Sequence, residues 1–85
     1  MSIDPGGRDP VYLQLADILE RQIRSGELPA GRMIPSEKTL QETWGLARGT
    51  VRKAVAVLRE RGLVDTVEHR GTFVIGGTKP PAADR

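Results

Sequence analysis

The sequence predicts a mainly α-helical fold with a small β-hairpin wing, the winged helix-turn-helix, with three helices and a two- or three-stranded antiparallel sheet. Residues 36–58 contain two stretches of helical pattern that meet at Gly45. The second stretch begins with basic residues, and two β-branched, apolar runs follow it within residues 63–76. An earlier apolar repeat at helical spacing supplies the remaining helix.

The first helix is expected to begin at Asp9-Pro10 and to run to about Arg24. Asp is suited to cap a helix, and Pro is suited to its first position, where a missing N–H costs nothing. Gly26 ends the helix, because glycine adopts the left-handed conformation that closes one. Apolar residues recur at helical spacing at positions 11, 12, 15, 18, 19 and 23.

The second and third helices form the helix-turn-helix, over about residues 37–56. Ser36 is a suitable N-cap for the second helix, which is expected to end near Trp44 with Gly45 making the turn. The third helix is expected over about residues 47–61. Its buried face lies on one arc of roughly 100° and consists of Val51, Ala54, Val55, Leu58 and Gly62.

A hairpin is expected to follow the third helix. Residues 63–68 and 72–76 form its strands, and His69, Arg70 and Gly71 form the short loop between them. Met33-Ile34 is a candidate for a third short strand beside the hairpin.

The folded domain is expected over residues 9–76, between two segments of different composition. Residues 1–8 are rich in Gly, Pro and Asp and predict a flexible N-terminus. Residues 77–85 predict a linker or tail to a C-terminal effector domain that this chain does not include.

The composition excludes several classes of site. The chain of 85 residues has no Cys and one His, so it lacks the residues for a disulfide, a thiolate metal site or a typical acid–base pair. We therefore expect neither an enzyme nor a cofactor or metal. No apolar run approaches the roughly 20 residues that cross a bilayer, and no signal pattern opens the chain. A cytoplasmic protein without membrane contact is expected.

Positive charge is concentrated on the third helix. The net charge of the chain is only +2, but residues 47–62 carry five basic residues against Glu60 alone, for a local charge of +4. Such a cluster is typical of a surface that binds phosphates, although a solvated helix face has the same composition.

The first turns of the third helix suit a DNA reader, since this end of the second helix of the motif reaches base edges in the major groove. Arg48 and Arg52 lie one turn apart, and arginine makes bidentate contacts with guanine. Gly49 allows close approach of the backbone, and Thr50 can contact phosphate or a thymine methyl. Lys53 points about 100° away from Arg52, toward phosphate.

Each of these residues also has a less specific interpretation. The motif itself could be an ordinary helical hairpin. Arg52 could form a salt bridge with Glu37 or Glu42, and Lys53 could simply be solvated. His69 and Arg70 are candidates for contact with the minor groove or with phosphate, or for an exposed loop tip. Arg59 lies 11 residues beyond Arg48, about 16 Å along the axis, which places it beyond the bases.

Residues 10–74 resemble the DNA-binding domain of GntR-type bacterial transcription regulators. The resemblance lies in the segments SGELPAG, IPSE, LRERGLV and RGTFV, in their order, together with Gly45 and Arg48. It implies a winged helix on double-stranded operator DNA, with the full-length protein acting as a homodimer on a palindrome, most often as a repressor.

The same resemblance transfers a set of DNA-binding positions to this chain. The family usually has Arg at the position of Lys38, Ser or Thr at that of Ala47, and Gly at that of His69. The positions implied by the resemblance are Lys38, Ala47, Arg48, Gly49, Thr50, Arg52, His69, Arg70 and Gly71, and helix geometry adds Lys53 to the expected DNA-binding residues.

A winged helix can also serve as a protein-interaction module without DNA recognition. The basic, glycine-containing start of the third helix argues against this alternative, because the centres of protein interfaces are depleted in charge.

Overall fold

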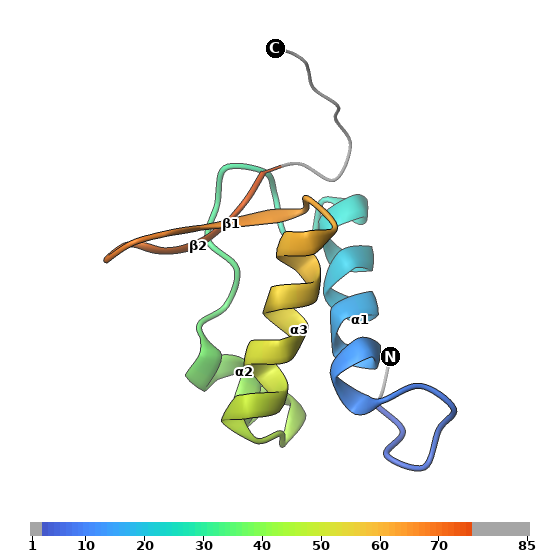
Figure 1. Cartoon of the computed structure of the whole chain (residues 1–85). Helices are drawn as coiled ribbons and strands as arrows, with labels where there is room; N and C mark the ends of the chain where they lie inside the picture. The colour runs from blue at the N-terminus through green and yellow to red at the C-terminus, as the bar shows by residue number, and fades with distance from the viewer. Residues whose placement is uncertain (1–2, 76–85) are drawn as a thin grey trace.

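The computed structural model describes residues 3–75 and contains three helices followed by a β-hairpin (Figure 1). This order confirms the winged helix-turn-helix expected from the sequence. The expected linker or tail at residues 77–85 lies outside the described residues. The elements are α1 (Val11–Ser25), α2 (Glu37–Trp44), α3 (Arg48–Glu60), β1 (Val64–Val67) and β2 (Gly71–Val74).

The start of α1 corrects one expectation, because Asp9 does not cap the helix. Pro10 is the N-cap, with an extended ψ of 150°, and no side chain caps the helix end. The Pro10 carbonyl accepts the first backbone hydrogen bonds, from Leu13 at 3.0 Å and Gln14 at 3.1 Å, so Asp9 lies one residue too early. The Gln14 side chain instead donates to the carbonyls of Asp9 and Asp4.

The ends of α2 and α3 follow the sequence prediction. The Ser36 hydroxyl accepts a hydrogen bond from the Thr39 N–H at 3.1 Å, which caps α2. Gly45 closes this helix with a φ of 68°, and Gly62 follows α3 with a φ of 75°. The Leu63 N–H then returns to the Leu58 carbonyl at 3.0 Å, a Schellman closure that turns the chain toward the hairpin.

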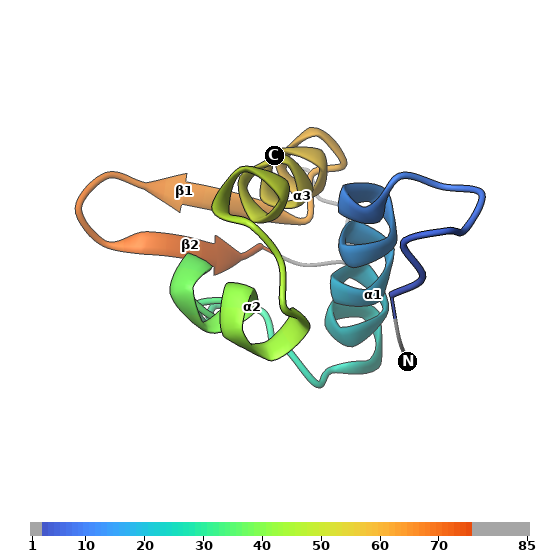
Figure 2. The same ribbon diagram turned by 90° about the horizontal axis from the view of Figure 1, so that it is seen from below.

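The core lies where α1 packs along α3. These two helices run side by side, and the hairpin lies on the opposite side of α3 from α1 (Figures 1 and 2). Ala16 and Ala54 are completely buried, which lets the helix backbones approach closely. The core cluster consists of Leu15, Ala16, Leu19, Ile23, Ile34, Leu40, Val51, Ala54, Val55, Leu58, Leu63, Val64 and Val74.

The loop before α2 attaches to the hairpin, as expected for Met33-Ile34. Strands β1 and β2 pair antiparallel, and Met33 forms an isolated bridge with Phe73 on the free edge of β2. The Ile34 N–H donates to the Thr72 backbone carbonyl at 2.9 Å, and the Val74 N–H donates to the Arg32 backbone carbonyl at 2.8 Å. The hairpin is therefore held from both sides, by α3 and by this loop.

An ion-pair network joins the C-terminal end of α3 to α1. Arg61 Nη1 contacts Asp17 Oδ1 at 2.9 Å and Glu20 Oε1 at 2.7 Å, and Arg24 Nε contacts Glu20 Oε2 at 2.8 Å. Hydrogen bonds from Arg24 and then Arg61 hold the pKa of Glu20 below its ordinary value of 4.5, although desolvation opposes them. The charged carboxylate is thus favoured in the folded state.

We predict that Glu20→Gln lowers the free energy of unfolding at pH 7 by about 1 kcal/mol, the upper end of the range for exposed ion pairs. Because the folded pKa of Glu20 is depressed, this contribution is present above 4.5 and is lost as the pH falls through the lowered value. Thermal unfolding at pH 7 and at about pH 3 measures the effect. The difference in unfolding free energy between variant and wild type should become smaller in acid, whereas a difference that does not change with pH would contradict the assignment. Glu60→Gln, at an exposed position of α3, is the control.

Candidate nucleic-acid interface

The first two turns of α3 present the residues that the sequence singles out. Ala47 is the N-cap, and its methyl group provides no capping hydrogen bond. Arg48, Gly49 and Arg52 are exposed, and Thr50 is half-buried. The side chains of Arg48 and Arg52 are 65% and 58% exposed, so this end of α3 offers two accessible guanidinium groups to a ligand.

Glu37, in the first turn of α2, contacts both of these arginines. Its Oε1 lies 3.4 Å from Arg48 Nε, and its Oε2 lies 3.2 Å from Arg52 Nε. The pairing of Arg52 with Glu37 is one of the two alternatives that the sequence leaves open. The pairing of Arg48 with the same carboxylate is not among the expectations from the sequence, which treat Arg48 only as a base-reading residue.

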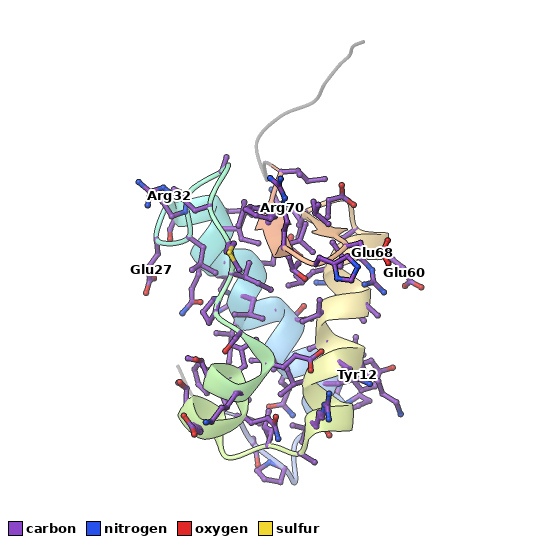
Figure 3. The ribbon with its side chains drawn as sticks, turned by 90° about the vertical axis from the view of Figure 1, so that its left-hand side faces the viewer. Tyr12, Glu27, Arg32, Glu60, Glu68 and Arg70 are labelled. Carbon is purple, nitrogen blue, oxygen red and sulfur yellow. The ribbon has the colours of Figure 1, made fainter. Side chains whose placement is uncertain are left out.

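Lys53 lies on the other flank of α3, next to α1. Its Nζ is 5.6 Å from the centroid of the Tyr12 ring, within reach of a cation–π interaction. Figure 3 shows Tyr12 beside the first turns of α3. The cations of this end of α3 therefore fall into two groups, with Arg48 and Arg52 toward α2 and Lys53 toward α1.

Arg59 contacts the wing, a role that sequence reasoning missed. Its Nη1 donates to Thr66 Oγ1 at 3.1 Å, and the Thr66 and Thr72 hydroxyls lie 3.1 Å apart. Regular helical spacing from Arg52 was the available signal, since residues seven apart share one helix face. A hollow of about 300 Å³ lies beside this contact, between α3, the start of α2 and the hairpin. Its lining consists of Glu37, Arg52, Val55, Arg59, Thr66 and Thr72.

The tip of the wing is a tight turn with His69 in an unusual conformation. The Arg70 N–H donates to the Val67 carbonyl at 3.0 Å, and His69 has a φ of 66°. Such a φ favours glycine, but His tolerates the left-handed region better than most residues with a side chain. His69 Nε2 lies 3.6 Å from Glu68 Oε2, and Arg70 extends from the same tip (Figure 3).

Gly71 belongs to β2 rather than to the loop in which the sequence placed it. It pairs with Val67, and its φ of 124° is disfavoured for any residue with a side chain. The Met33 methyl group lies over it, 2.5 Å from where a Cβ would be. Lys38 is exposed nearby, on a hollow of about 390 Å³ between the start of α2 and the wing.

Other kinds of site are not found in the part of the chain that the structure describes. Residues 3–75 contain no group of three or more His, Cys, Asp or Glu side chains placed to hold a metal ion. Within the same residues, no helix combines the length and the apolar character needed to cross a membrane.

Comparison with known proteins identifies the family. Residues 11–74 match the sequence profile of the bacterial regulatory proteins of the gntR family. The chain belongs to the GntR family. Among similar proteins is the mannosyl-D-glycerate transport/metabolism system repressor MngR of Escherichia coli K12. It is 40% identical over 68 residues, which are 80% of this chain and 28% of that protein.

Solved structures of GntR-type domains have the same fold. YtrA from Sulfolobus acidocaldarius, a GntR-family transcription factor, superposes with a TM-score of 0.80 at 33% identity, over 88% of this chain and 79% of that one. AraR(DBD) in complex with operator ORX1 gives a TM-score of 0.78 at 32% identity, over 87% of this chain and 92% of that one. The chain spans only 26–32% of the length of the curated relatives that it matches.

We predict that Gly71→Ala destabilises the GntR domain by about 1–3 kcal/mol, because a side chain is strained at this backbone conformation. The double variant Gly71→Ala, Met33→Ala should recover little, since the end of the Met33 side chain can move away from the new methyl group. Chemical denaturation measures both effects. Full recovery in the double variant would show that the contact, rather than the backbone, sets the cost.

Proposed function

We propose that this chain is the DNA-reading domain of a bacterial transcription repressor that binds a palindromic operator. Helix α3 enters the major groove with its N-terminal end, and the wing contacts the adjacent backbone or minor groove. Membership of the GntR family supports this proposal. So do the similarity to a protein named as a repressor and the similarity to AraR(DBD), which was solved on its operator.

The observation that carries the proposal is the exposed arginine pair on the first two turns of α3. Arg48 and Arg52 lie on one face of the helix, and both side chains are more than half exposed. A helix fits the major groove, and arginine matches the N7 and O6 acceptors of guanine with two hydrogen bonds. Each arginine is therefore assigned to a base, with guanine as the preferred partner.

Gly49 provides independent support. A glycine in a helix costs stability relative to alanine, and this one adopts no left-handed φ that would require it. Apart from its chain neighbours and the nearby backbone of α3, no atom of residues 3–75 lies within 4 Å of where its Cβ would be, so internal packing does not require a glycine either. An external backbone that approaches this turn closely explains the choice of residue.

The remaining expected residues surround the arginine pair. We assign Thr50, Lys53 and Lys38 to phosphates, because each offers a hydroxyl or ammonium donor on α3 or on the first turn of α2, next to Glu37 and the arginine pair. Ala47 brings the backbone N–H groups at the start of α3 close to the DNA. The wing residues His69, Arg70 and Gly71 follow the groove next to the half-site.

The proposal includes a homodimer of the full-length protein, with one domain on each half of the palindrome, in the bacterial cytoplasm where the chromosome lies. Linking two reading domains raises the effective concentration of the second. The proposed function is binding rather than catalysis, and it is supported by the similarity to proteins named as a transcriptional regulator and a transcriptional repressor.

The proposal predicts that affinity for duplex DNA depends strongly on salt. Raising the salt from about 50 to about 200 mM should weaken binding on the order of 10³-fold if six or more phosphates are neutralised. Selection from a random DNA pool, followed by titration of the selected duplex at several salt concentrations, tests this. A flat salt dependence, or a failure to enrich any sequence, would contradict sequence-specific DNA binding.

The two flanks of α3 predict different mutational effects. Arg48→Ala and Arg52→Ala should each cost about 1–3 kcal/mol on the selected operator and relax the preference at one base position. Lys53→Ala should weaken all sequences equally and lower the salt slope by about one. Binding to the operator, to single-base variants and to random duplex distinguishes these results. Equal losses on operator and random DNA for the arginine variants would refute the base-reading assignment.

A further inference from the structure

One carboxylate on α2 is shared between the two arginines assigned to base reading, and this inference rests on that assignment. Glu37 Oε1 and Oε2 each contact a different guanidinium, at 3.4 Å from Arg48 and 3.2 Å from Arg52. Its side chain is 42% exposed, and pairs at such exposure contribute little to folding stability. The contact therefore matters mainly for the orientation of the two guanidinium groups.

The backbone holds Glu37 firmly in this position. Ser36 caps α2 through the Thr39 N–H at 3.1 Å, and Glu37 is the first residue of the helix. The negative charge is favourable there, next to the positive end of the helix dipole. Gly45 then turns the chain so that the first turns of α3 lie beside this carboxylate.

The contacts leave the base-reading atoms of the arginines accessible. Among the described residues, the hydrogen bonds from Arg48 and Arg52 to Glu37 are donated by Nε rather than by the terminal nitrogens. The Nη1 and Nη2 groups form the outer fork of a guanidinium, and this fork can donate two parallel hydrogen bonds to guanine O6 and N7. A carboxylate at Nε thus orients the guanidinium end-on toward the groove.

The same carboxylate opposes binding that does not use bases. Two like charges on successive turns repel each other, and a negative charge between them holds them side by side. Without it, each arginine is free to swing toward a separate phosphate, which attracts it equally on any sequence. A fixed negative charge also repels phosphates that approach this part of α3, and repulsion of wrong partners raises specificity.

We propose that Glu37 is a positioning residue that determines specificity: it holds Arg48 and Arg52 end-on for guanine and disfavours their use as phosphate contacts. Glu37 itself touches no base in this arrangement.

The test compares Glu37→Gln with Glu42→Gln. Both variants remove one negative charge from α2, but Glu42 is exposed and contacts neither arginine in the described structure. The measured quantity is the ratio of affinities for the selected operator and for random duplex, with thermal unfolding as a check on folding. We expect Glu37→Gln to reduce this ratio about tenfold, mainly by strengthening random binding, and Glu42→Gln to leave it within about twofold.

Two further results bear on the mechanism. In the background Arg48→Ala, Arg52→Ala, the substitution Glu37→Gln should no longer change the ratio, because the residues through which it acts are gone. An equal effect of Glu37→Gln and Glu42→Gln on the ratio in the otherwise wild-type protein would overturn the proposal. So would a loss of preference at a base position that neither arginine variant affects, since Glu37 would then read a base itself. If the wild-type domain prefers no sequence over random DNA, the proposed function fails instead.

Discussion

The packing of α3 against α1 fixes the rest of the structure, because it decides which side of α3 meets solvent. Val51, Ala54 and Leu58 are fully buried, and α3 therefore cannot rotate without exposing them. A helix turns about 100° per residue, so burial of this face places Arg48, Arg52 and Arg59 on the side of α2 and the wing. The position of the proposed interface is thus a consequence of the core. Loss of a core contact would change the aim of the arginines as well as the stability of the fold.

The wing depends on the same helix at several points. The closure after Gly62 sets the direction in which β1 leaves α3, and Arg59 contacts Thr66 at 3.1 Å partway along the strand. On the other edge of the hairpin, the Ile34 N–H donates to the Thr72 backbone carbonyl, so the loop that precedes α2 also holds β2. The hairpin is therefore fixed relative to both helices of the helix-turn-helix. A wing fixed in this way keeps a constant offset from α3, which two contacts on one DNA segment require.

The parts of the fold that the sequence predicts correctly depend on local rules. Gly45 and Gly62 close helices because they adopt positive φ, Ser36 caps a helix through its own hydroxyl, and apolar spacing marks the buried face of α3. The parts that it misses depend on tertiary distance or on one dihedral angle. Asp9 fails as a cap because Pro10 has an extended ψ, and the contact of Lys53 with Tyr12 joins residues that are far apart in sequence.

The structure also changes how the basic cluster is understood. Of the five basic residues within 47–62, Arg61 forms its ion pairs with Asp17 and Glu20 on α1, and Arg59 hydrogen-bonds to the wing. The local charge of +4 therefore overstates the charge that faces a ligand, and Glu37 lowers it further beside Arg48 and Arg52. Nonspecific affinity grows with the number of cations that are free to reach phosphates, whereas discrimination grows with how firmly each donor is aimed at a base. Under the proposed function, the pairing of these arginines with acidic and hydroxyl groups of neighbouring elements reduces the first quantity and increases the second.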